Sequence, residues 1–329
     1  LEPPTTTMLF GLSNSFVIIN IACLSDKGSN LFRNLSKFVT SLNRVIMILV
    51  ADSGSTKVAW RVVHGDGTIQ AIQTVGINPF FVSEQDILKT IEHSLKPAIR
   101  GEVRQVFFYG AGVAGKDKID ILTRCFQTAF PGCSVEANSD LLAAARCLFG
   151  TEKGIAAILG TGANTCFYDG EKIVDNVPAC GYILGDEGGG AVLGKKLVSD
   201  YLKRMLPRDL SEAFEKQYKL GLLDIIEKVY RQPMPNRFLA SFTFFLGDHQ
   251  SHPYIRDFLA KAFDEFFLRN IIHYDYKTYP VRIVGSVAHY FREEVMASAA
   301  RHGMQVEKIV RTPIEGLVAY HRNLIAQQE

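Results

Sequence analysis

A carboxylate, a turn of small residues and a lysine follow one another directly after an apolar stretch of the chain. They belong to "ILVADSGSTK", residues 48 to 57, where Asp52 stands at the expected end of a buried strand. A carboxylate is costly at such a place unless it holds a cation, and Mg²⁺ between one carboxylate and phosphate oxygens meets that need. We therefore interpret Asp52 as a Mg²⁺ position, reached directly or through water.

A second turn of small residues, "GTGAN", follows the apolar run "GIAAIL" at residues 160 to 164. Strand, small-residue turn and strand thus occur twice, which indicates an internal repeat with one turn on each of two related domains. Small side chains let backbone N–H groups converge on an oxyanion, so phosphate is the ligand expected at both turns. Taken alone, each turn also fits a plain hairpin connection.

The elements that must position these turns follow an α/β pattern from Met47 onward. Strands are predicted at residues 46–52, 57–63, 68–75, 103–110 and 154–159, with a short strand near Val135 and a hairpin over 165–175. Helices are predicted from Ser83 to about Ile99, from Lys116 to Ala129, after Asp140, from about Ala191 to Arg204, and at the C-terminus. Three strands in series followed by βα units predict a mixed sheet with an antiparallel edge and a parallel interior.

Residues 1 to 46 stand apart from this pattern. The segment at residues 8 to 24 is similar to a signal segment, but no Lys or Arg precedes it, and its unbroken apolar part from Phe16 is too short to span a bilayer. Met47 is a plausible natural start. We expect residues 1 to 46 to be an N-terminal extension that the fold does not require.

Three glycine-bearing stretches together resemble a known superfamily. "ADSGSTK", "GTGAN" and "IVGSVA" at residues 283 to 288 are similar, in order and spacing, to the two phosphate loops and the adenosine loop of the actin, sugar kinase and heat-shock chaperone superfamily. "GINPF" (76–80), "NSDLLAAA" (138–145) and "GYILGDEGGGA" (181–191) resemble its N-acetylglucosamine kinase branch, which is related to the benzoyl-CoA reductase activating ATPases. The resemblance covers about Met47 to His321.

The resemblance implies a two-domain α/β protein of duplicated RNase H-like (actin-like ATPase) fold. Its mixed sheets would be flanked by helices, with ATP and Mg²⁺ in an active site in the interdomain cleft. Residues 47–151 plus 313–329 would form the first domain, and residues 152–312 the second. The C-terminal helix would therefore return to pack on the first domain.

The same resemblance assigns the nucleotide contacts. The residues implied are Gly54, Ser55, Thr56 and Lys57 in the first loop, Gly160, Thr161 and Gly162 in the second, and Gly285 and Ser286 beside the adenosine. The first loop departs from the family's run of glycines, so Ser53 and Ser55 must tolerate a geometry that glycine adopts freely, and ATP binding is expected to be weaker. "LGDEGGGA" also carries a third Gly where the family usually has a Ser, a second departure that concerns the sugar side or domain closure.

The sugar side is assigned in the same way. Asp140 matches the family's general base, with a helix N-cap as the alternative reading. Asn78 resembles an amide that binds sugar hydroxyls, and a turn residue is its alternative. Asp186 matches an active-site carboxylate, and its alternative is an acidic helix start. Gly181 and Tyr182 lie where the family contacts the N-acetyl group.

Two functions of different class are compatible with these residues. The first is a kinase that transfers the γ-phosphoryl group of ATP to the 6-hydroxyl of N-acetylglucosamine or a related hexosamine. The second is an ATPase that activates a partner iron–sulfur redox enzyme. The six cysteines include no CxxC pair, and no pair of them suits a shared cluster. We therefore favour the kinase.

Composition limits the partners. The chain has 329 residues, of which 47% are hydrophobic, and a formal net charge of +2, so no global field would recruit nucleic acid or a membrane surface. We expect a cytoplasmic protein with reduced thiols and a small-molecule sugar as partner, and a homodimer is compatible with the sequence. His249 and His252 have a spacing that two metal ligands could share, but without a nearby third ligand a solvated loop is favoured.

Overall fold

The computed structural model describes residues 5–12, 15–22, 46–54 and 56–326. The chain divides into two compact units, Leu1–Ile46 and Met47–Glu329. In the first unit, β1 (Thr5–Leu12) and β2 (Ser15–Ala22) pair as an antiparallel hairpin. The candidate functional residues all belong to the second unit.

Five strands form the first sheet of the second unit. They are β3 (Ile46–Ser53), β4 (Lys57–His64), β5 (Ile69–Val75), β6 (Glu102–Gly110) and β7 (Ser134–Ser139), in the order β5-β4-β3-β6-β7. β3 pairs with β4, and β4 with β5, in antiparallel fashion, whereas β6 and β7 are parallel. The predicted mixed sheet with an antiparallel edge is confirmed.

The second sheet repeats this arrangement. Its strands are β8 (Gly154–Leu159), β9 (Ala163–Tyr168), β10 (Ile173–Asp175), β11 (Val281–Val284) and β12 (Val306–Val310), in the order β10-β9-β8-β11-β12. β8, β9 and β10 are antiparallel in series, and β11 runs parallel to both β8 and β12. Each sheet therefore has its strands in the order third, second, first, fourth, fifth.

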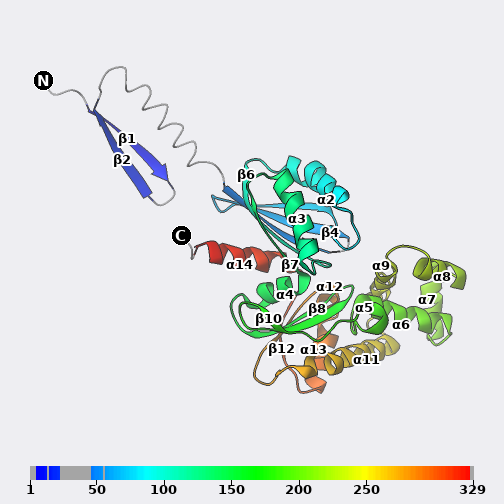
Figure 1. The fold of residues 1–329 in the computed structure, drawn as a ribbon. Helices are drawn as coiled ribbons and strands as arrows, with labels where there is room; N and C mark the ends of the chain where they lie inside the picture. Colours follow the sequence, from blue (N-terminus) through cyan, green and yellow to red (C-terminus); the bar gives the residue numbers. More distant parts are fainter. Residues whose placement is uncertain (1–4, 13–14, 23–45, 55, 327–329) are drawn as a thin grey trace. The chain divides into compact units, whose positions relative to one another are not determined.

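The helices on the first sheet are α2 (Glu84–Thr90) and α3 (Lys116–Ala129), which pack over it in Figure 1. Trp60, Phe108 and Phe126 meet edge to face or tilted in the core between sheet and helices. The continuous helix predicted from Ser83 to about Ile99 is interrupted: α2 passes into a π turn at Ile91–Leu95 and a 3₁₀ turn at Lys96–Ala98. Pro97 within that last turn explains why a regular helix ends there.

Helix α4 (Asp140–Phe149) packs against both sheets. Ala143 faces a cluster with Val50 and Tyr109 of the first sheet. Ala144 and Leu148, on another side of the helix, pack against the second sheet. Small residues let the helix approach both sheets closely. Asp140, which begins α4, is therefore held in place by contacts of the helix with both sheets.

The C-terminal helix α14 (Ile314–Ala326) returns to the first sheet. Glu315 forms an ion pair with Arg61 of β4 at 2.6 Å. The buried His321 ring stacks on Phe107, and its Nε2 lies 2.8 Å from the Tyr109 hydroxyl. Packing and polar contacts together anchor this helix.

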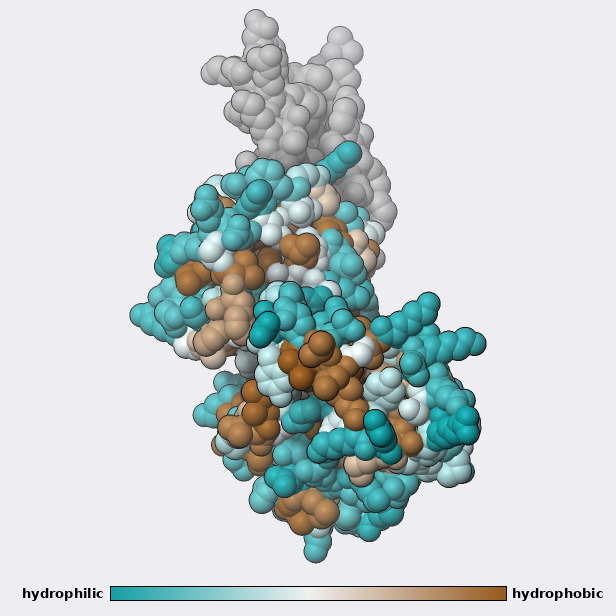
Figure 2. Space-filling view, turned by 90° about the vertical axis from the view of Figure 1, so that its right-hand side faces the viewer, coloured by the Kyte–Doolittle hydropathy of each residue, from teal (hydrophilic) through white to brown (hydrophobic). Residues whose placement is uncertain are grey.

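Helices also cover the second sheet and extend beyond it. They are α5 (Gly181–Leu184), α6 (Gly190–Leu202), α7 (Arg208–Tyr218), α8 (Leu222–Tyr230), α9 (Pro235–Ala240), α10 (Thr243–Asp248), α11 (Pro253–Arg269), α12 (Ser286–Tyr290) and α13 (Arg292–Arg301). Among the described residues, none of the helices combines the length and apolar content needed to cross a bilayer. Hydrophobic residues also gather in separate patches on the face shown in Figure 2. Phe80, Phe81 and Leu184 are among the exposed apolar side chains.

Candidate active site

The first loop lies between β3 and β4, at the end of a buried strand. The backbone N–H of Gly54 donates to the Lys57 carbonyl at 3.0 Å, and the Gly76 N–H donates to the Thr56 carbonyl, also at 3.0 Å. Gly54 and Thr56 are exposed, and Ser55 lies outside the described residues. Ser53 does not have a positive φ, so the strain expected at this position is absent.

Asp52, the residue before the last of β3, is a partly buried carboxylate. Burial raises its pKa to about 6, the nearby charge of Asp140 adds to the rise, and Lys57 opposes it. A cation placed at this carboxylate would relieve the cost of burying its charge. Among the described residues, no group of three or more His, Cys, Asp or Glu side chains could hold a metal. One carboxylate fits Mg²⁺, which commonly keeps several waters and binds substrate phosphates.

Asp140 is the first residue of α4. The cap of this helix is Ser139, whose Oγ accepts a hydrogen bond from the Leu142 N–H at 3.2 Å. The N-cap alternative for Asp140 is therefore wrong. Burial raises the pKa of the Asp140 carboxyl, and the backbone N–H groups of Leu141 and of Asp140 itself partly offset that rise.

Asp186 lies four residues before α6, so the alternative of an acidic helix start is also wrong. It adopts a left-handed conformation with φ of 56°, and its Oδ1 accepts from the Ala163 N–H at 3.2 Å. Burial raises its pKa, as do the charges of Glu187 and Asp140, while Lys195 lowers it. Asp140 thus interacts electrostatically with both Asp52 and Asp186, which gathers three carboxylates in one region.

The second loop, Gly160 to Gly162, is fixed by the start of α6. The N–H groups of Gly190 and Ala191 donate to the carbonyls of Gly160 and Thr161, each at 2.8 Å. At Gly189, a Cβ would lie 2.7 Å from the carbonyl carbon of Gly162. The glycine run after Asp186 therefore allows the helix and the loop to approach this closely.

Gly285 joins the expected adenosine loop to the second of the two expected phosphate loops. It follows β11 with φ of +141°, and a Cβ there would lie only 2.1 Å from the Leu159 carbonyl oxygen. Leu159 immediately precedes Gly160. Ser286, the first residue of α12, is exposed. Two loops far apart in the sequence thus lie together.

Asn78 forms the turn that its alternative reading predicts. Its Oδ1 accepts from the Phe80 N–H at 2.9 Å. Its Nδ2 has no hydrogen-bond partner among the residues that the structure describes. The Asn78 amide also packs on Gly112, where a Cβ would lie 2.1 Å from Oδ1. The turn role and a free N–H donor therefore occur in the same side chain.

Gly181 and Tyr182 begin the short helix α5. Gly181 has φ of +68° and open space around it, and Tyr182 is partly buried. The Tyr182 carbonyl accepts from Lys195 Nζ at 2.7 Å. Lys195, which also lowers the pKa of Asp186, thus connects this segment to α6. No hydrogen bond between described residues joins Asn78 or Tyr182 to the three carboxylates.

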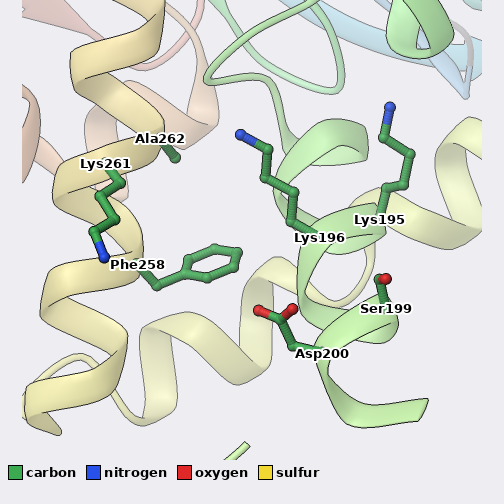
Figure 3. A pocket seen from close by; sticks show the side chains of 7 residues that line it. All are labelled: Lys195, Lys196, Ser199, Asp200, Phe258, Lys261 and Ala262. Carbon is green, nitrogen blue, oxygen red and sulfur yellow. The ribbon is translucent and has the colours of Figure 1, made fainter. Parts of the chain in front are cut away.

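A cavity of about 480 Å³ lies between α6 and α11, and none of these three carboxylates lines it. Its lining includes Lys195, Lys196, Lys261 and Phe258, as Figure 3 shows. Lys196 is paired with Glu265, and Lys261 with Asp257. Lys195 donates to the Tyr182 carbonyl, so each of the three lysines has a hydrogen-bond or ion-pair partner.

His249 and His252 each have a local structural partner. The Nδ1 of His252 accepts from the Tyr254 N–H at 3.1 Å and so caps α11. The Nδ1 of His249 lies 2.9 Å from the Phe245 carbonyl, and its ring stacks on Phe245. Both histidines are half-buried, whereas Asp248 and Ser251 in the same segment are exposed, as expected of a solvated loop.

Sequence reasoning did not assign roles to four residues that support the site. They are Ser139, Lys195, Gly112 and, as a hydrogen-bonding group, Ser53. A Ser directly before a helix start is a known cap signal, so Ser139 was detectable from the sequence. The contacts of Lys195 and Gly112 are made across the fold and leave no local pattern.

No family model and no curated protein sequence matches the chain. A solved structure from Porphyromonas gingivalis, described as a "Putative N-acetylglucosamine Kinase", is 41% identical, with a TM-score of 0.80, and the match covers 84% of this chain and 99% of that one. A structure of the same description from Chromobacterium violaceum is 18% identical, with a TM-score of 0.65 and coverages of 84% and 99%.

A third solved structure, a ROK family transcriptional regulator described as a homolog of the E. coli MLC protein, is 12% identical, with a TM-score of 0.50 and coverages of 84% and 78%. At such identity it shows the fold alone, as does the C. violaceum structure. Together with the repeated strand order, these likenesses confirm the predicted α/β, actin-like ATPase fold.

Proposed function

Because this chain belongs to the same family as the P. gingivalis protein, the N-acetylglucosamine kinase branch of the actin, sugar kinase and heat-shock chaperone superfamily, we propose that it is an ATP-dependent amino-sugar kinase. It transfers the γ-phosphoryl group of ATP to the 6-hydroxyl of N-acetylglucosamine or a related hexosamine. The observation that carries this proposal is the position of Asp140 at the start of α4, the helix that packs on both sheets.

The nucleotide binds between two domains in this proposal. Residues 47–151 with 313–329 form one domain, residues 152–312 form the other, and ATP occupies the cleft. The first loop, with Gly54, Ser55, Thr56 and Lys57, and the second loop, at Gly160 to Gly162, hold the phosphates through backbone N–H groups. Gly285 and Ser286 border the adenosine.

Asp52 positions Mg²⁺, directly or through a water molecule. The bound cation supplies positive charge that neutralises the phosphate oxygens as charge moves toward the leaving group. The chain itself contributes a carboxylate whose pKa is raised to about 6 by burial, so that it is largely ionised at neutral pH. Lys57 adds a second positive charge on the same side.

Asp140 acts as the general base. It accepts the proton of the sugar hydroxyl as that oxygen forms a bond to the γ-phosphorus, and the bond from phosphorus to the β,γ-bridging oxygen breaks to release ADP. Its raised pKa makes it a better proton acceptor than an ordinary aspartate, and as the first residue of α4 it is held against both sheets. Asn78 Nδ2 binds sugar hydroxyls, Gly181 and Tyr182 border the N-acetyl group, and Asp186 completes the sugar side.

A coupled ADP-release assay over N-acetylglucosamine, glucosamine, N-acetylmannosamine and glucose tests the proposal. We expect ADP release to require an amino sugar, and phosphorus NMR of the product to place the phosphate on the 6-oxygen. ADP release that is independent of every sugar would instead support an ATPase that drives a partner protein.

The same assay on Asp140→Asn tests the base. The amide keeps the size and hydrogen-bonding capacity of the carboxyl but cannot accept the proton, so kcat should fall by about 10²–10⁴ while the sugar KM changes much less. Ser139→Ala is the control, because it removes the true helix cap and should lower stability by about 1 kcal/mol. Turnover by Asp140→Asn at the wild-type rate would exclude Asp140 as the base.

A further inference from the structure

Ser53 lies between the proposed metal carboxylate and the first glycine of the proposed phosphate loop, and its hydroxyl both donates and accepts a hydrogen bond inside the protein. The residue is only 2% exposed. Its Oγ donates to the Ile77 carbonyl at 2.7 Å and accepts from the Ile77 N–H at 3.2 Å. A serine hydroxyl has one donor and two acceptor positions, so this single side chain satisfies both backbone groups of Ile77.

Ile77 immediately precedes Asn78, the proposed sugar amide. The Asn78 carbonyl accepts from the N–H groups of Phe81 and Val82, which closes the turn that follows. On the other side of Ile77, the Gly76 N–H donates to Thr56 of the phosphate loop. Two adjacent residues before Asn78 are therefore hydrogen-bonded to the strand end and loop proposed to hold the nucleotide.

The loop after β6 contacts both Ser53 and Asn78. A Cβ at Gly110 would lie 3.0 Å from the Ser53 Cβ, and the Ala111 N–H donates to the Ser53 carbonyl at 3.4 Å. Gly112, two residues after Gly110, packs against the Asn78 amide. Ser53 is therefore connected to Asn78 by two series of contacts, one through Ile77 and one through the Gly110–Gly112 backbone.

We propose that Ser53 is a positioning residue that transmits nucleotide binding at the first phosphate loop to the sugar-binding amide of Asn78. This inference rests on the proposed kinase function and adds a requirement to it: the affinity for sugar depends on bound nucleotide through one buried hydroxyl. A glycine at position 53, as in the family's run of glycines, has no side chain that could form these hydrogen bonds to Ile77. The serine that looked like a departure from the pattern therefore has a specific role in this chain.

The test compares Ser53→Ala with Ser298→Ala. Ser298 is a matched control, since it is also fully buried and its Oγ donates to a side chain, Asp264 Oδ1 at 2.5 Å, on helices of the second sheet. Coupling energies between sites commonly correspond to about 5- to 150-fold in affinity. We therefore expect Ser53→Ala to raise the sugar KM by about 10-fold with kcat and the ATP KM within about 3-fold. Ser298→Ala should lower the melting temperature and leave both KM values unchanged.

Hydrogen exchange provides a readout that does not depend on catalysis. Addition of ADP should increase the protection of a peptide containing residues 76 to 82 in the wild-type protein and in Ser298→Ala, but not in Ser53→Ala. If no amino sugar is phosphorylated while this pattern is observed, the kinase proposal fails and the link stands. If ADP leaves these residues unaffected in the wild type, or if Ser53→Ala matches the wild type in both sugar KM and exchange, the inference is overturned.

Discussion

Three carboxylates at this site have different surroundings, which suits them to different roles. Burial raises the pKa of Asp52, Asp140 and Asp186, and the charge on Asp140 adds to the rise at both of the others. Lys57 opposes the rise at Asp52, and Lys195 opposes it at Asp186. At Asp140 only backbone N–H groups oppose it. The residue without a stabilising cation is the one best suited to accept a proton.

These shifts predict a pH dependence. Asp52 must be ionised to hold a cation, and because its pKa is raised to about 6, its charged form is lost as pH falls through that value. We expect kcat/KM for ATP to fall on the acid side with an apparent pKa near 6, well above that of an ordinary aspartate.

Lys57→Met should move this acid limb to higher pH, because Lys57 lowers the pKa of Asp52. Lys261→Met is a control, since Lys261 pairs with Asp257 on α11. Rate profiles from pH 5 to 8 for the three proteins provide the measurement. A wild-type limb below pH 5, or one that Lys57→Met leaves in place, would contradict this electrostatic account.

At the scale of elements, local sequence pattern was a good guide to strands and long helices and a poor guide to contacts between distant segments. The bounds of α3 and β8 are those predicted, because an amphipathic period and a buried apolar run are local signals. The division of the helix after Ser83 and the helices α7 to α10 were not predicted. Their order depends on packing, as the aromatic cluster around Phe214 and Phe242 shows.

In the candidate site, too, local motifs were predictable from the sequence and contacts between distant residues were not. The turn at Asp52 and the start of α4 at Asp140 were visible as motifs, because each lies at a strand end or a helix start. The Ser53–Ile77 hydrogen bonds were not, since they join residues 24 positions apart and need the fold to bring them together. Sequence pattern therefore predicts where chemistry occurs better than what holds it in place.

The meeting of β11 with the second phosphate loop depends on Gly285. Gly285→Ala would place its Cβ 2.1 Å from the Leu159 carbonyl oxygen and force β11 and the loop apart. We expect the ATP KM to rise at least about 10-fold, with a fall in melting temperature. Gly303→Ala is the matched control, because Gly303 also has a positive φ but nothing within 4 Å of the added atom. Equal effects of the two substitutions on the ATP KM would indicate backbone strain alone.

Gly112 has the corresponding role on the sugar side. Gly112→Ala would place its Cβ 2.1 Å from Asn78 Oδ1, which is held by the Phe80 N–H and cannot simply rotate away. We expect the sugar KM to rise about 10-fold or more while the ATP KM changes little, a loss of positioning rather than of fold. Gly132→Ala, at a positive φ in open space, controls for strain in the same part of the chain. An unchanged sugar KM would remove Asn78 from the sugar site.

At the scale of the whole molecule, the repeated strand order accounts for the pair of proposed phosphate loops. In each sheet the turn between the first two antiparallel strands carries the small residues, Gly54 in one and Gly160 in the other. Helix α4 connects the two sheets in sequence and packs on both. A duplicated unit thus supplies two similar turns, and the helix that connects the two sheets begins with Asp140.

The unit Met47–Glu329 should fold and act without residues 1 to 46. Met47–Glu329 forms a compact unit by itself, and the proposed site residues all lie in it. A shortened chain that starts at Met47 should therefore keep its melting temperature within a few degrees and its kcat within about twofold.

Removal of residues 314 to 329 is the contrasting truncation, because it takes away the Arg61–Glu315 ion pair and the buried His321 contact. That protein should lose cooperative unfolding and turnover. Circular dichroism melts and the ADP-release assay on both truncations distinguish the cases, and an inactive or unfolded chain starting at Met47 would show that the first 46 residues are part of the working fold.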